Sequence, residues 1–138
     1  MTSERIVRAA VGGTALFTLL SVLAAVTDAD ALVVVTVVVD LALFLVGCLA
    51  FVLTLLRAAA RSRTDELTLP GLWWLAGSAP APVRRALLGA FGVEVAVGLA
   101  TASARPFTGL AFGVLAPVFG LGLAGLWGAR LGTFPPRV

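Results

Sequence analysis

The chain has 138 residues, of which 60% are hydrophobic and 12% charged, and its mean hydropathy is +1.09. A soluble domain of this size could not bury so much apolar surface, because small domains bury the smallest fraction of their surface. The net charge of +3 comes from arginines that stand at the ends of apolar segments, a placement that favours lipid headgroups over nucleic acid. We therefore expect an all-α, single-domain integral membrane protein whose first partner is the lipid bilayer.

Four apolar segments are long enough to cross a membrane, which takes about 20 helical residues. They cover residues 9–26, 31–56, 86–104 and 109–128, and predict a transmembrane four-helix bundle. The second segment exceeds the thickness of a bilayer, so we expect it to tilt or to protrude. The first also has the outline of a cleavable signal peptide, but cleavage after Ala31 would leave a chain that starts within the next apolar run. A spanning helix is therefore preferred.

The arginines orient the segments. Nine of the ten precede the first segment, lie between the second and third, or follow the fourth, whereas Arg105 lies on the other side with Asp28 and Asp30. Basic residues concentrate on the cytoplasmic side. This distribution predicts cytoplasmic N- and C-termini in the inner (plasma) membrane. It also places all three tryptophans, Trp73, Trp74 and Trp127, at the inner interface.

The long connection at residues 57–85 has three parts. Residues 57–63 are expected to continue the second helix into water, and the small, proline-rich residues 77–82 predict a turn. Residues 67–75 are apolar but too short to span, so they lie in the interface or enter the membrane as a re-entrant piece. This part could be a docking surface, but a connector anchored by tryptophans is the simpler interpretation.

Two acidic residues, Asp40 and Glu94, fall inside apolar segments. Both lie about 14–15 Å from the outer end of their segments at 1.5 Å per residue, close to the membrane midplane. Each acid belongs to a stripe of small or polar residues that recur every three, four or seven positions, and therefore lie on one face of a helix. The stripes are Thr36, Asp40, Gly47 and Thr54, then Ala90, Glu94, Gly98 and Thr101, and a third in the first segment, Thr14, Thr18, Ser21 and Ala25. Intramembrane acids are functional candidates by default, and small and hydroxyl residues mark helix contacts.

We expect the two acids to lie close together inside the bundle, with at least one protonated at neutral pH, because no basic residue lies within a segment. Candidate hydrogen-bond partners are Thr18, Thr36 and the carbonyl of Gly113, which Pro117 cannot bond. Three roles stay open: a structural hydrogen-bonded pair, proton or cation handling, and pairing with a basic residue of another subunit. A structural role predicts that Asp40→Leu leaves a partner unsatisfied and destabilises the protein.

The fourth segment has a glycine stripe, with Gly109 and Gly113 forming a GxxxG motif and Gly120 and Gly128 continuing it. Such stripes let helices approach closely. We expect this face to pack on another helix, within the chain or in a homo-oligomer, and Leu123 to face lipid.

Catalysis and cofactor binding find little support. The chain has no histidine, and Cys48 is its single cysteine, so it lacks the usual ligands for haem or zinc and the usual nucleophile pairs. A phosphate-binding loop is also absent. We expect no catalytic residue, no metal and no cofactor.

The stretch from Ala104 to Arg137, which begins Ala-Arg-Pro-Phe-Thr-Gly-Leu-Ala-Phe-Gly, resembles the C-terminal part of small membrane proteins of actinobacteria. The stretch Leu69-Pro-Gly-Leu-Trp-Trp-Leu-Ala-Gly-Ser-Ala-Pro is similar too. The resemblance covers about the second half of the chain. It implies a four-helix inner-membrane protein without an assigned activity, and no site residue carries over.

Two functions remain. The first is a non-catalytic accessory, scaffold or assembly subunit of a membrane complex. The second is a small transporter or channel, built from several copies, in which Asp40 and Glu94 handle protons or cations.

The arginine distribution gives a direct test of topology. With single cysteines at positions 3, 28 and 62 in a Cys48→Ala background, a membrane-impermeant thiol reagent added outside intact cells should label position 28 alone. Labelling of position 62 from outside would contradict the predicted orientation.

Overall fold

The computed structural model describes residues 2–138 and contains six helical elements. These are α1 (Ser3–Thr27), α2 (Asp30–Arg61), α3 (Leu69–Trp73), α4 (Ala81–Ala104), the 3₁₀ helix η1 (Gly109–Leu115) and α5 (Pro117–Leu131). Four stretches are long and apolar enough to cross a membrane: α1, α2, α4, and η1 together with α5. The prediction of an all-α fold with four such stretches is confirmed.

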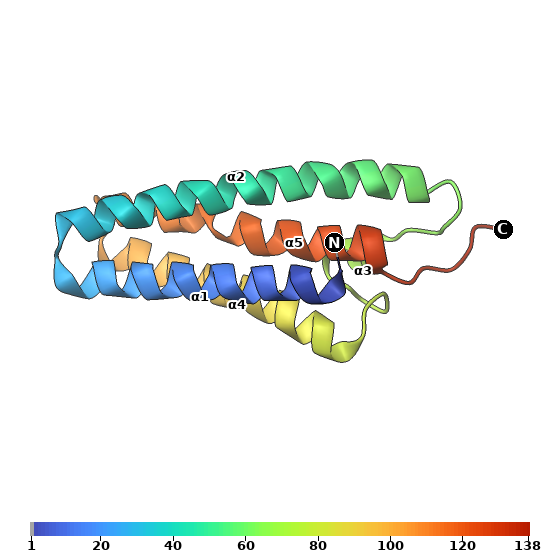
Figure 1. Cartoon of the computed structure of the whole chain (residues 1–138), viewed down its shortest axis with the longest axis horizontal. Coiled ribbons are helices and arrows are strands. Elements are labelled where there is room, and N and C mark those ends of the chain that lie inside the picture. The colour runs from blue at the N-terminus through green and yellow to red at the C-terminus, as the bar shows by residue number, and fades with distance from the viewer. Residues whose placement is uncertain (1) are drawn as a thin grey trace.

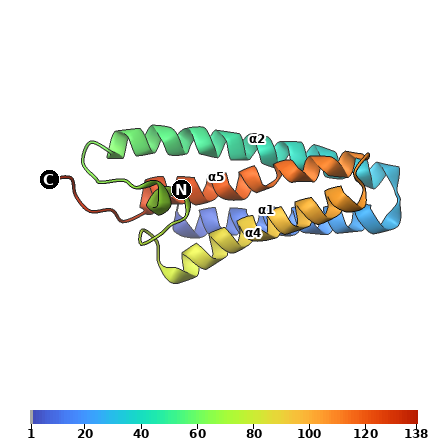
Figure 2. The same ribbon diagram turned by 180° about the vertical axis from the view of Figure 1, so that it is seen from behind.

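The long helices run side by side along one axis (Figure 1). α1 and α4 point one way, and α2 and α5 point the other way. Both ends of the chain and α3 lie at one end of the bundle, and the α1–α2 and α4–η1 connections lie at the opposite end (Figures 1 and 2). The N-terminal end of α4 diverges from the other helices in both views. The bundle is therefore closed at one end and splayed at the other.

The helices extend beyond the apolar segments that predicted them. Thr2 caps α1 by accepting a hydrogen bond from the backbone N–H of Arg5 (3.3 Å). After the last helical residue, Thr27, Asp28 adopts a left-handed conformation (φ 52°) that terminates the helix. α2 has 32 residues and continues to Arg61, about 48 Å at 1.5 Å per residue. The expected continuation of the second helix past residue 57 is confirmed as far as Arg61, while residues 62 and 63 lie in a turn.

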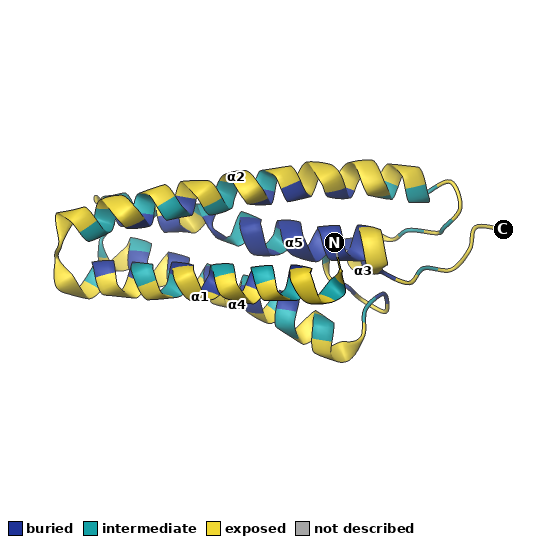
Figure 3. Ribbon diagram, in the orientation of Figure 1, coloured by how far each residue is buried: buried dark blue, intermediate teal, exposed yellow. Residues whose placement is uncertain are grey.

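α5 occupies the centre of the bundle. Residues 122–129 are all buried, whereas α1, α2 and α4 each expose an outer face (Figure 3). Leu123 is 4% exposed, so the expectation that it faces outward is wrong. That expectation failed because α5 is covered on every side in this part. Trp127 is buried too, and its Nε1–H donates to Ser3 Oγ (2.8 Å) at the bundle end that holds the termini. Its predicted depth at the inner interface stays a prediction.

The predicted glycine stripe packs against other elements of the same chain. A Cβ atom at any of its four positions would approach a neighbour: Val37 at Gly109, Phe17 at Gly113, Glu94 at Gly120 and Leu72 at Gly128. The α2–α5 contact uses a further pair, Gly47 and Gly122. A Cβ on Gly122 would lie 2.5 Å from the carbonyl oxygen of Gly47, which is backbone and cannot move aside. Here the two helices touch through their main chains.

The fourth apolar stretch is not one continuous α-helix, as residues 109–128 predicted. It is a 3₁₀ helix up to Leu115 and an α-helix from Pro117. Proline lacks an N–H and its ring clashes with the preceding turn, so an α-helix breaks there. The carbonyl of Gly113, which was expected to be left free, accepts the N–H of Ala116 (3.2 Å). The tighter 3₁₀ turn thus satisfies this acceptor.

Residues 67–75 fold back on the last turns of α5 as the short helix α3 and the residues after it. Leu72 and Leu75 are buried, and the ring of Trp73 lies against Gly125 and stacks on Phe51 with 4.4 Å between ring centroids. Trp74, in contrast, is 47% exposed. A turn is present at residues 76–78, with Gly77 at φ 73°, but the turn predicted at 77–82 is shorter than expected because α4 already begins at Ala81.

The C-terminal tail is hydrogen-bonded to neighbouring loops at the end of the bundle that holds both termini. The N–H of Glu66 donates to the carbonyl of Pro135 (2.8 Å), and the N–H of Arg137 donates to that of Thr64 (2.7 Å). The Arg61 guanidinium bonds Asp65 (2.6 Å) and the carbonyl of Ala129 (3.2 Å). These bonds hold the loop after α2 and the tail after α5 together.

The Gly47–Gly122 contact predicts a large effect from one methyl group. Gly122→Ala should lower the free energy of unfolding by about 1–3 kcal/mol, because the helices must separate to admit a Cβ. Gly12→Ala is the matched control, since a Cβ there has no neighbour within 4 Å, and it should be neutral or slightly stabilising. Thermal unfolding in a mild detergent measures both. Equal melting temperatures for the two variants would contradict the close contact.

Candidate functional site

Both acidic residues point into the bundle. Asp40 and Glu94 have no exposed surface. Every member of their two predicted stripes is buried as well, on α2 and on α4. The prediction that the acids lie inside, on faces of small and polar residues, is confirmed.

Glu94 accepts two hydrogen bonds across the interior. Its Oε1 accepts from the hydroxyl of Thr14 on α1 (2.7 Å), and its Oε2 accepts from the backbone N–H of Gly120 on α5 (3.0 Å). Gly120 lies in the first turn of α5, where backbone N–H groups lack acceptors within the helix. Glu94 therefore caps α5 from a neighbouring helix. The positive end of the α5 dipole also favours a negative carboxylate at this position.

Glycine is needed at position 120 for this capping bond. A Cβ there would overlap Glu94 Oε2 and approach the backbone of Phe91 to 3.0 Å. One turn further along α4, Gly98 serves the same purpose, since a Cβ on it would lie 2.6 Å from the carbonyl oxygen of Gly113. Small residues on α4 and α5 thus bring the broken stretch close enough for the Glu94 side chain to reach it.

Asp40 is different. Neither of its carboxylate oxygens has a hydrogen-bond partner within residues 2–138. On the same face of α2, Val37 contacts Gly109 and Gly47 contacts Val118 and Phe119. Asp40 lies between these contacts, so it faces the stretch that contains the break between η1 and α5. The second acid is therefore buried beside the break without taking part in capping.

The helix registers place the two acids at similar depths. The Thr36 hydroxyl reaches the carbonyl of Leu20 (3.4 Å), and Glu94 is bonded to Thr14. Because α1 and α2 are antiparallel, Asp40, which lies four residues after Thr36, is level with about residue 16 of α1, four residues before Leu20. The two acids thus differ by about two residues, or about 3 Å, along the bundle axis. No hydrogen bond joins them in the described part of the chain: the Glu94 oxygens accept from Thr14 and Gly120, and the Asp40 oxygens have no partner.

The two threonines predicted as partners do not bond either acid. Thr36 donates to the carbonyl of Leu32 (2.8 Å) as well as reaching Leu20, and the buried hydroxyl of Thr18 has no partner within residues 2–138. Ser21 is buried in the same way. The partner of Glu94 is Thr14, a member of the predicted polar stripe that sequence reasoning did not single out. Matching its position to Glu94 needs the α1–α4 register, which only the structure provides.

Pro117 acts through the backbone. It is the first residue of α5, where its missing N–H costs nothing. Its effect is to create a helix N-terminus halfway along the bundle, and this is the end that Glu94 caps.

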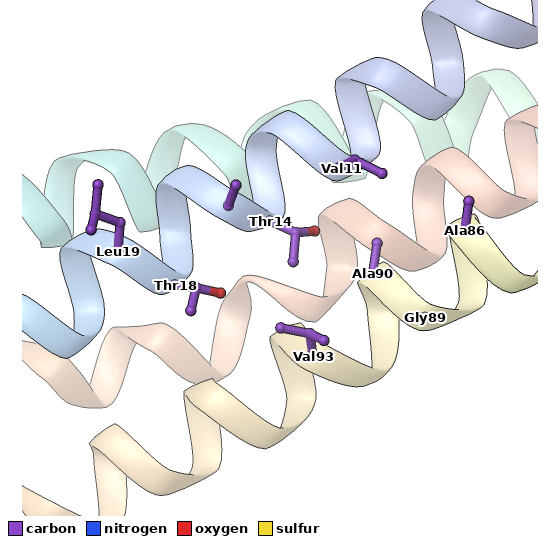
Figure 4. A pocket seen from close by; sticks show the side chains of 9 residues that line it. Val11, Thr14, Thr18, Leu19, Ala86, Gly89, Ala90 and Val93 are labelled. Atoms are coloured by element: carbon purple, nitrogen blue, oxygen red, sulfur yellow. The ribbon is translucent and has the colours of Figure 1, made fainter.

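A groove of about 460 Å³ runs along the surface between α1 and α4 (Figure 4). Thr14 and Thr18 line it from α1, and Gly89, Ala90 and Val93 line it from α4. Its other lining residues are apolar, and neither acid is among them. Of the residues described, no three histidine, cysteine, aspartate or glutamate side chains gather as a metal site would require.

Comparisons with protein families, with curated proteins and with solved structures give no match for the chain. The functional argument therefore depends on the geometry above.

The unequal partners of the two acids predict unequal effects of removing them. Glu94→Met should destabilise the protein by about 1–3 kcal/mol, because it leaves the buried N–H of Gly120 without an acceptor. Asp40→Leu has nearly the same shape as the native residue and removes a carboxyl without a partner. It should leave stability unchanged or raise it. This reverses the expectation drawn from the sequence.

Thermal and denaturant unfolding of both variants in detergent checks this contrast. Glu94→Gln is the control, since its amide oxygen can still accept from Gly120. A larger loss of stability for Asp40→Leu than for Glu94→Met would contradict the assignment of partners.

Proposed function

We propose that the chain is a multi-pass protein of the plasma membrane that acts without catalysis, as an accessory, scaffold or assembly subunit of a membrane complex. The four long apolar stretches support membrane insertion. The outer faces of α1, α2 and α4 carry exposed leucine and valine, as surfaces that contact lipid do.

Cytoplasmic termini are part of this proposal. The bundle end that holds both termini also carries nine of the ten arginines, which supports a cytoplasmic location. Arg105, at the other end, forms a salt bridge with Asp28 and donates to the carbonyl of Ala25 (3.0 Å). Its charge is thereby compensated at the C-terminal end of α1.

The observation that carries the non-catalytic role is the position of α5. The centre of the bundle is filled by a helix whose residues 122–129 are all buried, and Glu94 is engaged in capping that helix. The carboxylate of Glu94 therefore stabilises the fold. A rigid, filled bundle suits a structural subunit better than a pathway for a solute.

The outer face of α2 is the surface we propose for a protein partner or a further copy of the chain. It is a stripe of exposed aliphatic side chains at spacings of three and four: Val34, Val38, Leu41, Leu45, Leu49, Val52 and Leu56. α2 is the most apolar of the long helices and the least buried. A flat aliphatic helix face of this length can pack against another transmembrane helix.

One observation favours the alternative, a small oligomeric transporter or channel for protons or cations. Asp40 is buried beside a broken helix and has no partner within residues 2–138. Unwound helices next to acidic residues form the ion sites of many transporters. In this alternative Asp40 takes up and releases the ion, and Glu94 keeps its structural role.

Two measurements separate the proposals. In the first, the tagged chain is purified from native membranes in mild detergent, and co-purifying membrane proteins are quantified by mass spectrometry. We expect a stoichiometric partner that is lost with Val38→Trp/Leu45→Trp. Leu99→Trp, an equally exposed position on α4, should retain it. A chain that purifies alone would contradict the accessory role.

In the second, the protein is reconstituted in liposomes that contain a pH-sensitive dye. We expect proton flux equal to that of protein-free liposomes. Flux that exceeds this level and disappears with Asp40→Asn would establish the alternative instead.

A further inference from the structure

The diverging end of α4 opens a second groove next to the first. This groove has a volume of about 700 Å³ and is lined by the loop at Gly77 and Ala79 and by the first turns of α4, including Arg84 and Arg85. Gly89 lines both this groove and the one between α1 and α4. The two hollows thus adjoin at Gly89, where the glycine offers no side chain to separate them.

The groove at the end of the bundle is basic. Neither Arg84 nor Arg85 forms a salt bridge within residues 2–138, and Arg84 Nε donates to the carbonyl of Trp74 (3.2 Å), which fixes its side chain at the groove. Two neighbouring guanidinium groups without a salt-bridge partner favour an anion with several oxygen acceptors.

The lining of the groove between the helices is apolar except for Thr14 and Thr18. Val11, Ala15 and Leu19 complete its α1 wall, and Ala86, Gly89, Ala90 and Val93 form its α4 wall (Figure 4). Arg85, Gly89 and Val93 follow one another at spacings of four, so the apolar groove continues directly from the basic one. From Arg85 to Val93 this line covers about 12 Å along the helix axis.

From this arrangement we propose that the two grooves form one binding site for an anionic phospholipid, with its phosphate at Arg84 and Arg85 and an acyl chain between α1 and α4. The inference rests on the proposed membrane insertion with this end at the cytoplasmic surface. In that orientation the basic groove is at headgroup depth and the apolar groove runs into the hydrocarbon. Basic pockets between transmembrane helices on the cytoplasmic side suit such headgroups.

Because the basic groove opens into the apolar one, the combined site fits a lipid better than other occupants. A free phosphate would use the arginines alone and gain nothing from the apolar groove. A partner helix would fill the apolar groove but would not require the two arginines. A phospholipid needs both, together with the open passage at Gly89, where a Cβ would have no neighbour within 4 Å.

The test measures binding of dioleoyl phosphatidylglycerol to the full chain in an uncharged detergent, by native mass spectrometry and by the rise in melting temperature. Wild type should bind one molecule in clear preference to dioleoyl phosphatidylcholine. Arg84→Gln/Arg85→Gln should weaken phosphatidylglycerol binding about thirtyfold, or about fivefold for each arginine. Arg63→Gln, an exposed arginine outside both grooves, should bind as wild type.

A second pair of variants tests the passage between the grooves. Gly89→Leu should weaken binding of both lipids. Gly92→Leu, at an equally open glycine that lines neither groove, should bind both normally. Equal retention of the two lipids by wild type, or unchanged binding in the double arginine variant, would overturn the proposal. Glycerol 3-phosphate that stabilises the protein as much as phosphatidylglycerol would also overturn it, in favour of a free-anion site.

These outcomes are separate from failure of membrane insertion. If the chain were not a membrane protein, it would be recovered without detergent from the soluble fraction of cells, and that fractionation is done before any lipid is added.

Discussion

The break in the fourth apolar stretch is the constraint on which the rest of the structure depends. Pro117 ends the 3₁₀ helix η1 and starts α5 halfway along the bundle, which leaves backbone N–H groups in an apolar interior. A buried donor without an acceptor costs about 1–3 kcal/mol. Glu94 supplies the acceptor for Gly120 from α4, and Thr14 bonds its other oxygen from α1. One carboxylate therefore connects three helices at the point where one of them is interrupted.

This connection requires short distances, and glycines provide them. Gly98 and Gly120 let α4 approach the broken stretch, while Gly47 and Gly122 let α2 approach α5 from the opposite side until their backbones touch. As a result α5 becomes the central helix, and the outer helices leave their aliphatic faces free. At the end of the bundle that holds both termini, α3 packs against the last turns of α5, and the C-terminal tail is hydrogen-bonded to the neighbouring loops. The filled centre and the free outer faces are the basis for proposing a structural subunit.

The sequence predicted which faces turn inward but not which residues meet. Period and hydropathy were enough to give the four stretches and the buried stripes of Asp40 and Glu94, because both follow from helix geometry and the exclusion of charge from apolar surfaces. The partners of Glu94 depend on how far α1 and α5 slide relative to α4, and no local pattern encodes that shift. For the same reason the predicted partners of the acids were each other, Thr18, Thr36 or a free carbonyl, whereas Glu94 bonds Thr14 and Gly120. Leu123 was misplaced because a central helix has no outer face.

Hydrogen exchange of the Gly120 amide tests the central claim most directly. It can be measured by NMR on protein labelled with ¹⁵N-glycine in lipid nanodiscs, with the amide of Gly128, which is buried near the C-terminal end of the same helix, as the internal reference. If Glu94 caps α5, the Gly120 amide should exchange slowly in wild type and at least about tenfold faster in Glu94→Met, which corresponds to the loss of about 1.4 kcal/mol of protection, while Gly128 stays unchanged. An exchange rate at Gly120 that does not respond to the loss of Glu94 would contradict the account.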